Sequence, residues 1–299
     1  MTPLRSRTPL GTAFEAVNHL LLVAFALSIA YPFWNTILLS FSGNTAVSSL
    51  GFMIWIDEWN TSAYRFVFTR DDVGRAYLNS IHRTTIGTVL IVAFTLCAAY
   101  PLSKRDLPGR TLVTIYILIT MFFSGGLIPN FLLIRSLGLI DSRWALILPL
   151  TTSGFYIIIM RNFLMALDSA LEDSAFIDGA NYLQILVRII LPVAKPVVAT
   201  VALWGAVSHW NAWLDALIYT TDNDLRVLQL LLRKIVFDAE ERFRRMLEGF
   251  IQIEEDVEEL PMVSVKSAVT LLTIGPIVLV YPFVQRYFIR GILVGSLKG

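Results

Sequence analysis

Six long windows of the sequence contain no Asp, Glu, Lys or Arg. They cover residues 20–41, 84–102, 111–134, 144–160, 197–214 and 267–284, and each is rich in apolar residues. A helix rises 1.5 Å per residue, so about 20 apolar residues cross a hydrocarbon core of roughly 30 Å. Because a backbone surrounded by lipid must satisfy its own hydrogen bonds, each window is predicted to be a transmembrane helix. The pattern therefore predicts an all-α membrane protein with six spanning helices.

The third window is longer than one span requires. Its Gly125-Gly126 pair and Pro129 are typical of a helix end. We therefore expect the third span to cover residues 111–128, with residues 130–140 at the membrane interface.

The composition extends this prediction to the whole chain. Hydrophobic residues make up 56% of the 299 residues and charged residues 16%, whereas soluble domains carry about 25% charged residues. We expect a single transmembrane domain over residues 1–299. The net charge of +1 comes without a strongly basic stretch, which excludes a nucleic-acid-binding patch.

Cysteine and histidine, which supply many metal sites and catalytic groups, are sparse in this sequence. Cys97 is the single cysteine, so an intrachain disulfide is excluded, and the histidines His19, His82 and His209 lack metal-ligand spacing. The sequence contains no phosphate-binding loop and no set of Ser, His and Asp in a catalytic pattern. We expect no catalytic residue, no metal site and no cofactor bound by this chain.

The distribution of charge predicts the orientation. Basic residues gather in the N-terminal flank, after the second window and near the C-terminus, namely Arg5, Arg7, Lys104, Arg105, Arg110, Arg286, Arg290 and Lys298. Short flanks rich in Lys and Arg stay in the cytoplasm. In residues 222–259 acids outnumber bases, which favours the outer face. Both termini are then cytoplasmic, and window 20–41 is a retained helix, because it is too long for a signal peptide and lacks a cleavage site.

The loop at residues 166–192 breaks this trend, because it lies on the cytoplasmic side yet carries several acids. Ser169 and Glu172 have the spacing of a capping box, which predicts the start of a short helix. Asp178-Gly179 predicts a turn. A second helix from Ala180 would direct Tyr182, Leu183, Ile185 and Leu186 toward an apolar surface. The loop is predicted to be a helix-turn-helix on the cytoplasmic face.

This loop resembles the EAA loop of binding-protein-dependent importer permeases. The family pattern is Glu-Ala-Ala, three residues, Gly, nine residues and Ile-x-Leu-Pro. This sequence keeps every spacing but has Asp173-Ser174 where the family usually has Glu-Ala. The candidate motif residues are Glu172, Asp173, Ser174, Ala175, Asp178, Gly179, Ile189, Leu191 and Pro192. The resemblance implies a coupling helix that docks on a separate ATPase subunit; the alternative is a solvated amphipathic loop.

Two further segments resemble carbohydrate-importer permeases, including the smaller maltose-importer permease. They are residues 281–288, followed by Gly291 and residues 295–299, and the run 139–149; together with the loop, the resemblance covers most of the chain from Asn79 onward. In the maltose relative the C-terminal tail reaches between the ATPase subunits. The matching residues here are Gly295, Ser296, Leu297, Lys298 and Gly299; the alternative is a frayed basic terminus.

The resemblance implies a six-helix permease of an importer in the bacterial inner membrane that works by alternating access. Its partners would be a second permease chain, two ATPase subunits that bind ATP and Mg, and an extracytoplasmic solute-binding protein. The implied substrate is a carbohydrate, and the overall likeness is to permeases for acidic or complex oligosaccharides such as the alginate importer. An importer of another solute, such as an amino acid or phosphate, a membrane enzyme and a stand-alone channel are the alternatives.

A cluster of aromatic and polar residues in the fifth window is a candidate solute path. The candidates are Trp204, Ser208, His209, Trp210 and Asn211, with Tyr156 from the fourth window. Aromatic faces pack on sugar rings, and polar residues inside a membrane are candidates for function. The alternative is an interfacial belt of aromatic residues, since Trp210 falls near the outer boundary.

The segment 222–262 is far longer than an ordinary connection. Its apolar stretch at residues 228–237 is able to form a helix, and charged blocks follow at residues 240–245 and 254–259. Such charge steers soluble partners. We expect this segment to be part of the docking surface for the binding protein.

Overall fold

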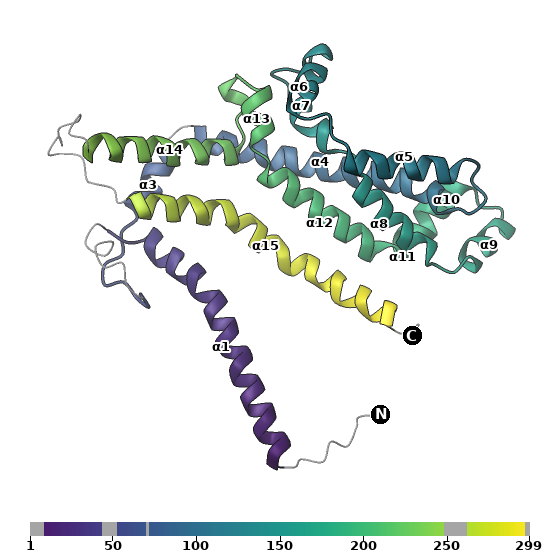
Figure 1. The fold of residues 1–299 in the computed structure, drawn as a ribbon, viewed down its shortest axis with the longest axis horizontal. Helices are drawn as coiled ribbons and strands as arrows, with labels where there is room; N and C mark the ends of the chain where they lie inside the picture. Colours follow the sequence, from purple (N-terminus) through teal and green to yellow (C-terminus); the bar gives the residue numbers. More distant parts are fainter. Residues whose placement is uncertain (1–8, 44–52, 70–71, 248–261, 297–299) are drawn as a thin grey trace. The chain divides into compact units, whose positions relative to one another are not determined.

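A computed structural model describes residues 9–43, 53–69, 72–247 and 262–296, which are largely helical and contain no strand (Figure 1). The contacts divide the chain into two compact units. One unit comprises Met1–Arg70 and Ile235–Leu272, and the other comprises Asp71–Lys234 and Thr273–Gly299. We refer to them as unit 1 and unit 2.

Among the described residues, three helices are long and apolar enough to cross a membrane unaided. They lie in α1 (Pro9–Ser40), α4 (Asp72–Ser103) and α15 (Met262–Ser296). Three further candidates are pairs of helices bent at a short break. In the first, α5 (Arg110–Phe122) and α6 (Leu127–Ser136) are bent by 114°. In the second, α7 (Arg143–Ile147) and η1 (Leu148–Leu150) are bent by 47° from α8 (Gly154–Met165), and in the third Tyr182–Val193 is bent by 83° from α12 (Lys195–Asn211). The number of candidate spans reaches six if each bent pair is one span.

The break between α5 and α6 has a local cause. Phe123 leaves the helical conformation with φ −117° and ψ 118°, and Gly126 has φ 81°, which residues with a side chain rarely adopt. Pro129 lies in the first turn of α6, where a missing backbone N–H breaks no helical hydrogen bond.

The core of unit 2 forms where α4, α8 and α12 pack side by side (Figure 1). Buried apolar residues from all three helices meet there, including Ile91, Ala99, Met160, Val197 and Val201. Helix association in lipid depends on close van der Waals contact, because lipid tails are as apolar as the side chains. Small residues provide that contact: a Cβ on Gly205 of α12 would lie 2.9 Å from Cδ1 of Ile91.

Unit 1 contains α1, the short helix α3 (Ser62–Phe68) and the beginning of α15. Two hydrogen bonds join them, from the Tyr64 hydroxyl to Ser40 Oγ (2.9 Å) and from Ser264 Oγ to the Ser42 carbonyl (2.8 Å). Most of α1 is nonetheless bare, and apolar side chains such as Leu20 and Phe25 are more than half exposed. A helix that is apolar all round requires lipid or another chain around it.

After α12 the chain forms α13 (Leu214–Tyr219), the single turn η3 (Asn223–Leu225) and α14 (Leu228–Leu247). α14 is amphipathic: Leu228, Leu231, Leu232 and Ile235 are buried at helical spacing, while Glu240, Glu241, Arg244 and Arg245 are exposed. Residues 248–261, the remainder of the long acidic segment, lie outside the described residues.

Candidate functional site

The loop that carries the EAA-like motif is a hairpin of short helices, and the first helix is α9 (Ala170–Ile177). Its first turn is capped by Asp168, whose Oδ1 accepts a hydrogen bond from the Ala170 N–H (3.0 Å). The expected capping box of Ser169 and Glu172 is wrong, since the Ser169 side chain makes no capping bond. Glu172 instead forms an ion pair with Lys104, next to the end of α4.

Gly179 forms the turn of this hairpin. Its φ of 81° is in the left-handed region, and the Ala180 N–H donates to the Ala175 carbonyl (3.0 Å) while the Gly179 N–H donates to the Phe176 carbonyl (3.0 Å). These are the two bonds of a Schellman motif, which satisfies the last carbonyls of a helix and reverses the chain. The turn predicted at Asp178-Gly179 is confirmed.

The second helix begins with a cap that sequence reasoning missed. Asn181 Oδ1 accepts from the Gln184 N–H, and Gln184 Oε1 accepts from the Asn181 N–H, both at 2.9 Å. The Asn-x-x-Gln spacing was the available signal. α10 (Tyr182–Ile185) starts there and continues through the π-helical turn η2 (Leu186–Ile190) and α11 (Leu191–Val193).

Apolar side chains project from this hairpin. Ile185 and Leu186 are buried, as expected, whereas Tyr182 and Leu183 are exposed. The exposed apolar residues are Leu171, Phe176, Ile177, Tyr182, Leu183 and Val187; we call them the hairpin face. Ile177 is 87% exposed, and Phe176 packs edge-on against Tyr182 with ring centroids 5.0 Å apart. An exposed apolar patch of this kind marks an interaction site.

The motif residues lie on both sides of the hairpin. Ala175 is buried, Glu172, Ile189 and Leu191 are partly buried, and Asp173, Ser174, Asp178, Gly179 and Pro192 are exposed. On the inner side, Lys104 pairs with Glu172 and lies 4.4 Å from the centre of the Tyr100 ring. The hairpin is therefore tied to α4 by charge, while the side chains of the hairpin face remain uncovered.

The structure separates the six candidate residues of the solute path into a cluster of three, a buried pair and one exposed residue. Tyr156, Trp204 and Ser208 lie together: the Tyr156 and Trp204 rings stack with centroids 6.0 Å apart, and the Tyr156 hydroxyl is 3.4 Å from Ser208 Oγ. His209 and Trp210 are buried in unit 2, where Trp210 Nε1 donates to the Thr273 carbonyl (3.0 Å). Asn211, at the end of α12, is exposed.

A buried ion pair lies beside the end of α12. Arg83 of α4 is 2% exposed, and its guanidinium binds both carboxylate oxygens of Asp215 and donates to the Ala212 carbonyl (3.0 Å). Sequence reasoning missed Arg83 because the apolar windows were chosen to exclude charged residues, and the second window began one residue later. The pair fixes the point where the chain leaves α12 and enters α13.

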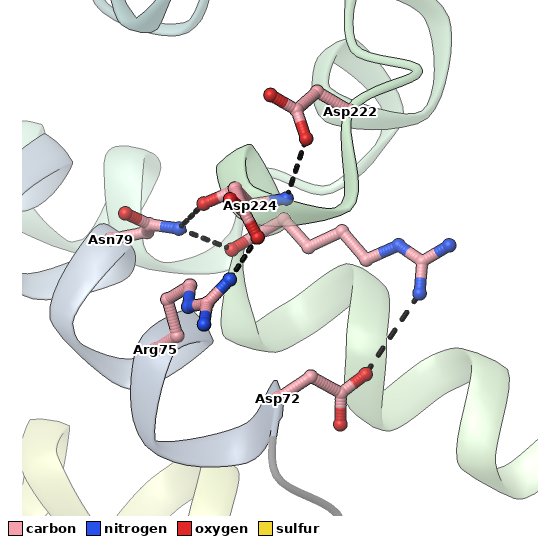
Figure 2. Close-up of polar contacts among 6 residues, drawn as sticks. Asp72, Arg75, Asn79, Asp222 and Asp224 are labelled. Carbon is pink, nitrogen blue, oxygen red and sulfur yellow. Dashed lines mark hydrogen bonds and ion pairs between the residues drawn. The ribbon is translucent and has the colours of Figure 1, made fainter.

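The first turns of α4 hold the turn η3 in a polar network, which Figure 2 shows. Arg75 forms an ion pair with Asp224, and Asp72 lies 3.8 Å from Arg226. The Asn79 amide donates to the carbonyls of Asp224 (2.7 Å) and Arg226 (3.0 Å). We call this network the α4 clamp; it orders the beginning of the long acidic segment.

Asp141 anchors the same segment from the connection between α6 and α7. Its carboxylate accepts from the Asp222 N–H (3.0 Å), the Thr221 N–H (2.6 Å) and the Thr221 hydroxyl (2.7 Å). These hydrogen bonds, that from Asp222 first, lower the pKa of Asp141 below the ordinary value of an aspartate. The carboxylate is therefore ionised at neutral pH and holds residues 221–222 as an anion.

The C-terminal candidates are only partly described. Gly295 and Ser296 belong to the last turn of α15. Leu297, Lys298 and Gly299 lie outside the described residues.

Comparison with known proteins gives consistent matches. Residues 88–294 match the family "Binding-protein-dependent transport system inner membrane component". The polygalacturonan/rhamnogalacturonan transport system permease protein YtcP of Bacillus subtilis (strain 168) is 38% identical over 286 residues, which cover 96% of this chain and 98% of the relative.

Solved structures agree with these matches. A chain of a bacterial ABC transporter involved in the import of the acidic polysaccharide alginate superposes with a TM-score of 0.80 at 34% identity, over 94% of this chain and 98% of that chain. A chain of an alginate transporter in complex with its alginate pentasaccharide-bound periplasmic protein has a TM-score of 0.52 at 14% identity, over 92% of this chain and 94% of that one, and shares the fold.

These findings confirm the expected fold class, and the family match assigns the chain to importer permeases rather than to membrane enzymes or stand-alone channels. In ABC importers the ATPase activity belongs to separate subunits. This multi-pass chain belongs to the family of binding-protein-dependent transport system inner membrane components, the permease subunits of ABC importers.

Proposed function

We propose that this permease imports an oligosaccharide derived from an acidic polysaccharide by alternating access. The observation that carries the proposal is the 38% identity, over 96% of the chain, to a permease named for polygalacturonan and rhamnogalacturonan transport. The likeness to the alginate importer points to the same chemical class, since both polymers contain uronic acids. An importer of an amino acid or phosphate is the competing function.

The hairpin face is the proposed dock for an ATPase subunit that binds ATP and Mg²⁺. Its exposed apolar side chains would enter a cleft on that subunit, and the Glu172–Lys104 ion pair would carry the movement of the hairpin to α4. A dock must be firm to transmit a rigid-body movement. The nine motif residues take this coupling role, and residues 295–299 are proposed to contact the ATPase subunits as well.

The remaining partners are a second permease chain and an extracytoplasmic binding protein. We assign the binding protein to the segment 222–262, whose first residues are ordered by the α4 clamp and by Asp141. The six predicted windows serve as the membrane spans, and both termini lie in the cytoplasm, as the basic flanks require. Reporter fusions at the two ends test this orientation.

The substrate class is tested with the assembled importer, purified with its binding protein and placed in lipid nanodiscs. Oligosaccharides of galacturonate, rhamnogalacturonan or mannuronate should stimulate ATP hydrolysis, whereas amino acids and phosphate should not. Stimulation by an amino acid or by phosphate, without a response to any saccharide, would contradict the proposal.

A further inference from the structure

Three aromatic rings from two helices form one partly exposed surface in unit 2. Phe155 and Tyr156 begin α8, and Trp204 lies on α12. The Trp204 ring stacks against Tyr156 at 25° between planes and lies 5.6 Å from the centre of the Phe155 ring. Ser208, one helical turn after Trp204, adds an exposed hydroxyl beside that of Tyr156. We call these four residues the ring platform.

The depth of the ring platform argues against a lipid-facing role. Ser208 lies inside the predicted span 197–214, six residues before its end. If lipid covered this surface, the hydroxyls of Ser208 and Tyr156 would have only each other as hydrogen-bond partners. Polar groups at such a depth face the interior of a bundle or a water-filled cavity.

The two faces of α12 explain why neighbouring residues take different roles. Gly205 and His209, one turn apart, face α4: a Cβ on Gly87 of α4 would lie 2.2 Å from His209 Nε2. Trp204 and Ser208, also one turn apart, share another face. His209 is 1% exposed, so we assign it and the buried Trp210 to helix packing rather than to the solute path.

We propose that the ring platform is a subsite that binds a pyranose ring of the imported saccharide inside the membrane. The flat Trp204–Tyr156 stack would contact the apolar face of the sugar, and the Ser208 and Tyr156 hydroxyls would exchange hydrogen bonds with its hydroxyl groups. This subsite rests on the proposed carbohydrate import. The subsite binds the sugar ring, and any carboxylate of the saccharide would be bound by residues outside the ring platform.

Water access is tested by cysteine labelling in the assembled importer. In a Cys97→Ser background, Ser208→Cys should react with a charged, membrane-impermeant thiol reagent about tenfold faster than Val201→Cys, a fully buried position on the same helix. Binding protein loaded with a galacturonate oligosaccharide, added with ATP, should slow that reaction. Failure of Ser208→Cys to react means that lipid or the second permease chain covers the platform. Reaction without protection means that no sugar occupies it; either result overturns the proposal.

Substitution of Trp204 supplies an independent readout. Trp204→Ala should raise the KM for saccharide uptake about three- to tenfold, which corresponds to about 0.7–1.4 kcal/mol. Trp204→Phe should restore most of it, because the Phe ring keeps an apolar face for the sugar. Trp144→Ala, at an exposed tryptophan outside the platform, should leave the KM unchanged. Equal KM values for Trp204→Ala and Trp144→Ala in a saccharide-responsive importer overturn the subsite alone. An importer that ignores every saccharide contradicts the proposed function together with the subsite.

Discussion

Two single residues hold polar turns of this chain in place by different means. Gly179 adopts a left-handed backbone that closes the hairpin, and Asp141 uses its carboxylate to anchor residues 221–222. The surroundings of Gly179 leave room for a side chain, since a Cβ there would meet nothing within 4 Å. Its requirement is therefore purely conformational, whereas that of Asp141 is electrostatic.

Replacing Gly179 should uncouple the importer. Gly179→Val places a β-branched side chain at φ 81°, which costs about 1–2 kcal/mol and disfavours the turn. Stimulation of ATP hydrolysis by loaded binding protein should fall, while membrane insertion persists. Gly179→Asn is the matched control, because Asn tolerates the left-handed region, and it should remain stimulated. Wild-type stimulation of Gly179→Val would show that the turn does not matter for coupling.

The stability that Asp141 contributes should decrease in acid and stay constant near physiological pH. Because its pKa is lowered in the folded chain, the carboxylate adds stability above its unfolded pKa, near 3.9, and that stability disappears as pH falls through the lowered value. The difference in melting temperature between wild type and Asp141→Asn should stay constant from about pH 8 to about pH 5 and shrink below about pH 4. A difference that already shrinks between about pH 8 and about pH 6 would contradict this assignment.

At the scale of elements, α4 organises unit 2. One stretch of this helix contributes the clamp residues, the next contributes Arg83, and the following turns pack on α8 and α12. Gly87 allows the His209 ring to lie directly on the α4 backbone. Close approach of this kind is how helices associate in the absence of a hydrophobic driving force.

Alanine substitution at two glycines of α4 should therefore have opposite effects on stability. Gly87→Ala forces the buried His209 ring to move and should destabilise the assembly by about 1–3 kcal/mol. Gly74→Ala has open space around its Cβ and gains helix propensity of up to about 1 kcal/mol. Thermal unfolding of the purified complex measures both. Equal melting temperatures for the two variants would mean that α4 and α12 are not in this close contact.

Breaking the pair of Arg83 and Asp215 should strongly lower stability, whereas replacing both residues by apolar ones should lower it much less. Asp215→Asn leaves a buried guanidinium without its counter-charge, a loss of about 3–5 kcal/mol, and Arg83→Met combined with Asp215→Leu should recover much of it. Glu241→Gln disrupts the exposed pair with Arg245 and should change stability by less than about 1 kcal/mol. Unfolding of the four proteins gives the comparison. A double variant as unstable as Asp215→Asn would indicate that the charges themselves are required.

At the scale of the whole molecule, the long acidic segment is the proposed docking surface for the binding protein. Replacing residues 240–258 by a short Gly-Ser bridge should preserve assembly and basal ATP hydrolysis and reduce stimulation by the binding protein, because the charged blocks that attract it are removed. The effect should be largest at limiting binding-protein concentration and low salt. Normal stimulation and normal uptake under those conditions would show the segment to be dispensable.

Features that depend on local chemistry could be predicted from the residues alone. Charge-free windows identify lipid as the solvent wherever they occur, and the Gly179 turn follows from backbone sterics alone, so both were predictable. The EAA-like motif is defined by spacing within one short segment, and its hairpin forms from local caps and turns. The missed Asn181 cap is of the same kind, since its signal lies within four residues.

Which faces of the helices are buried depends instead on how distant helices pack together. A window that is apolar all round carries no amphipathic signal, so its sequence does not tell a buried face from an exposed one. α12 shows the consequence: Ser208 is exposed and Trp204 is partly exposed, while His209 and Trp210 are enclosed by α4 and by residues near Thr273. Arg83 and Asp215 are 132 positions apart and become a pair only when α4 packs beside α12. Which residues line a path and which hold helices together is set by these long-range contacts.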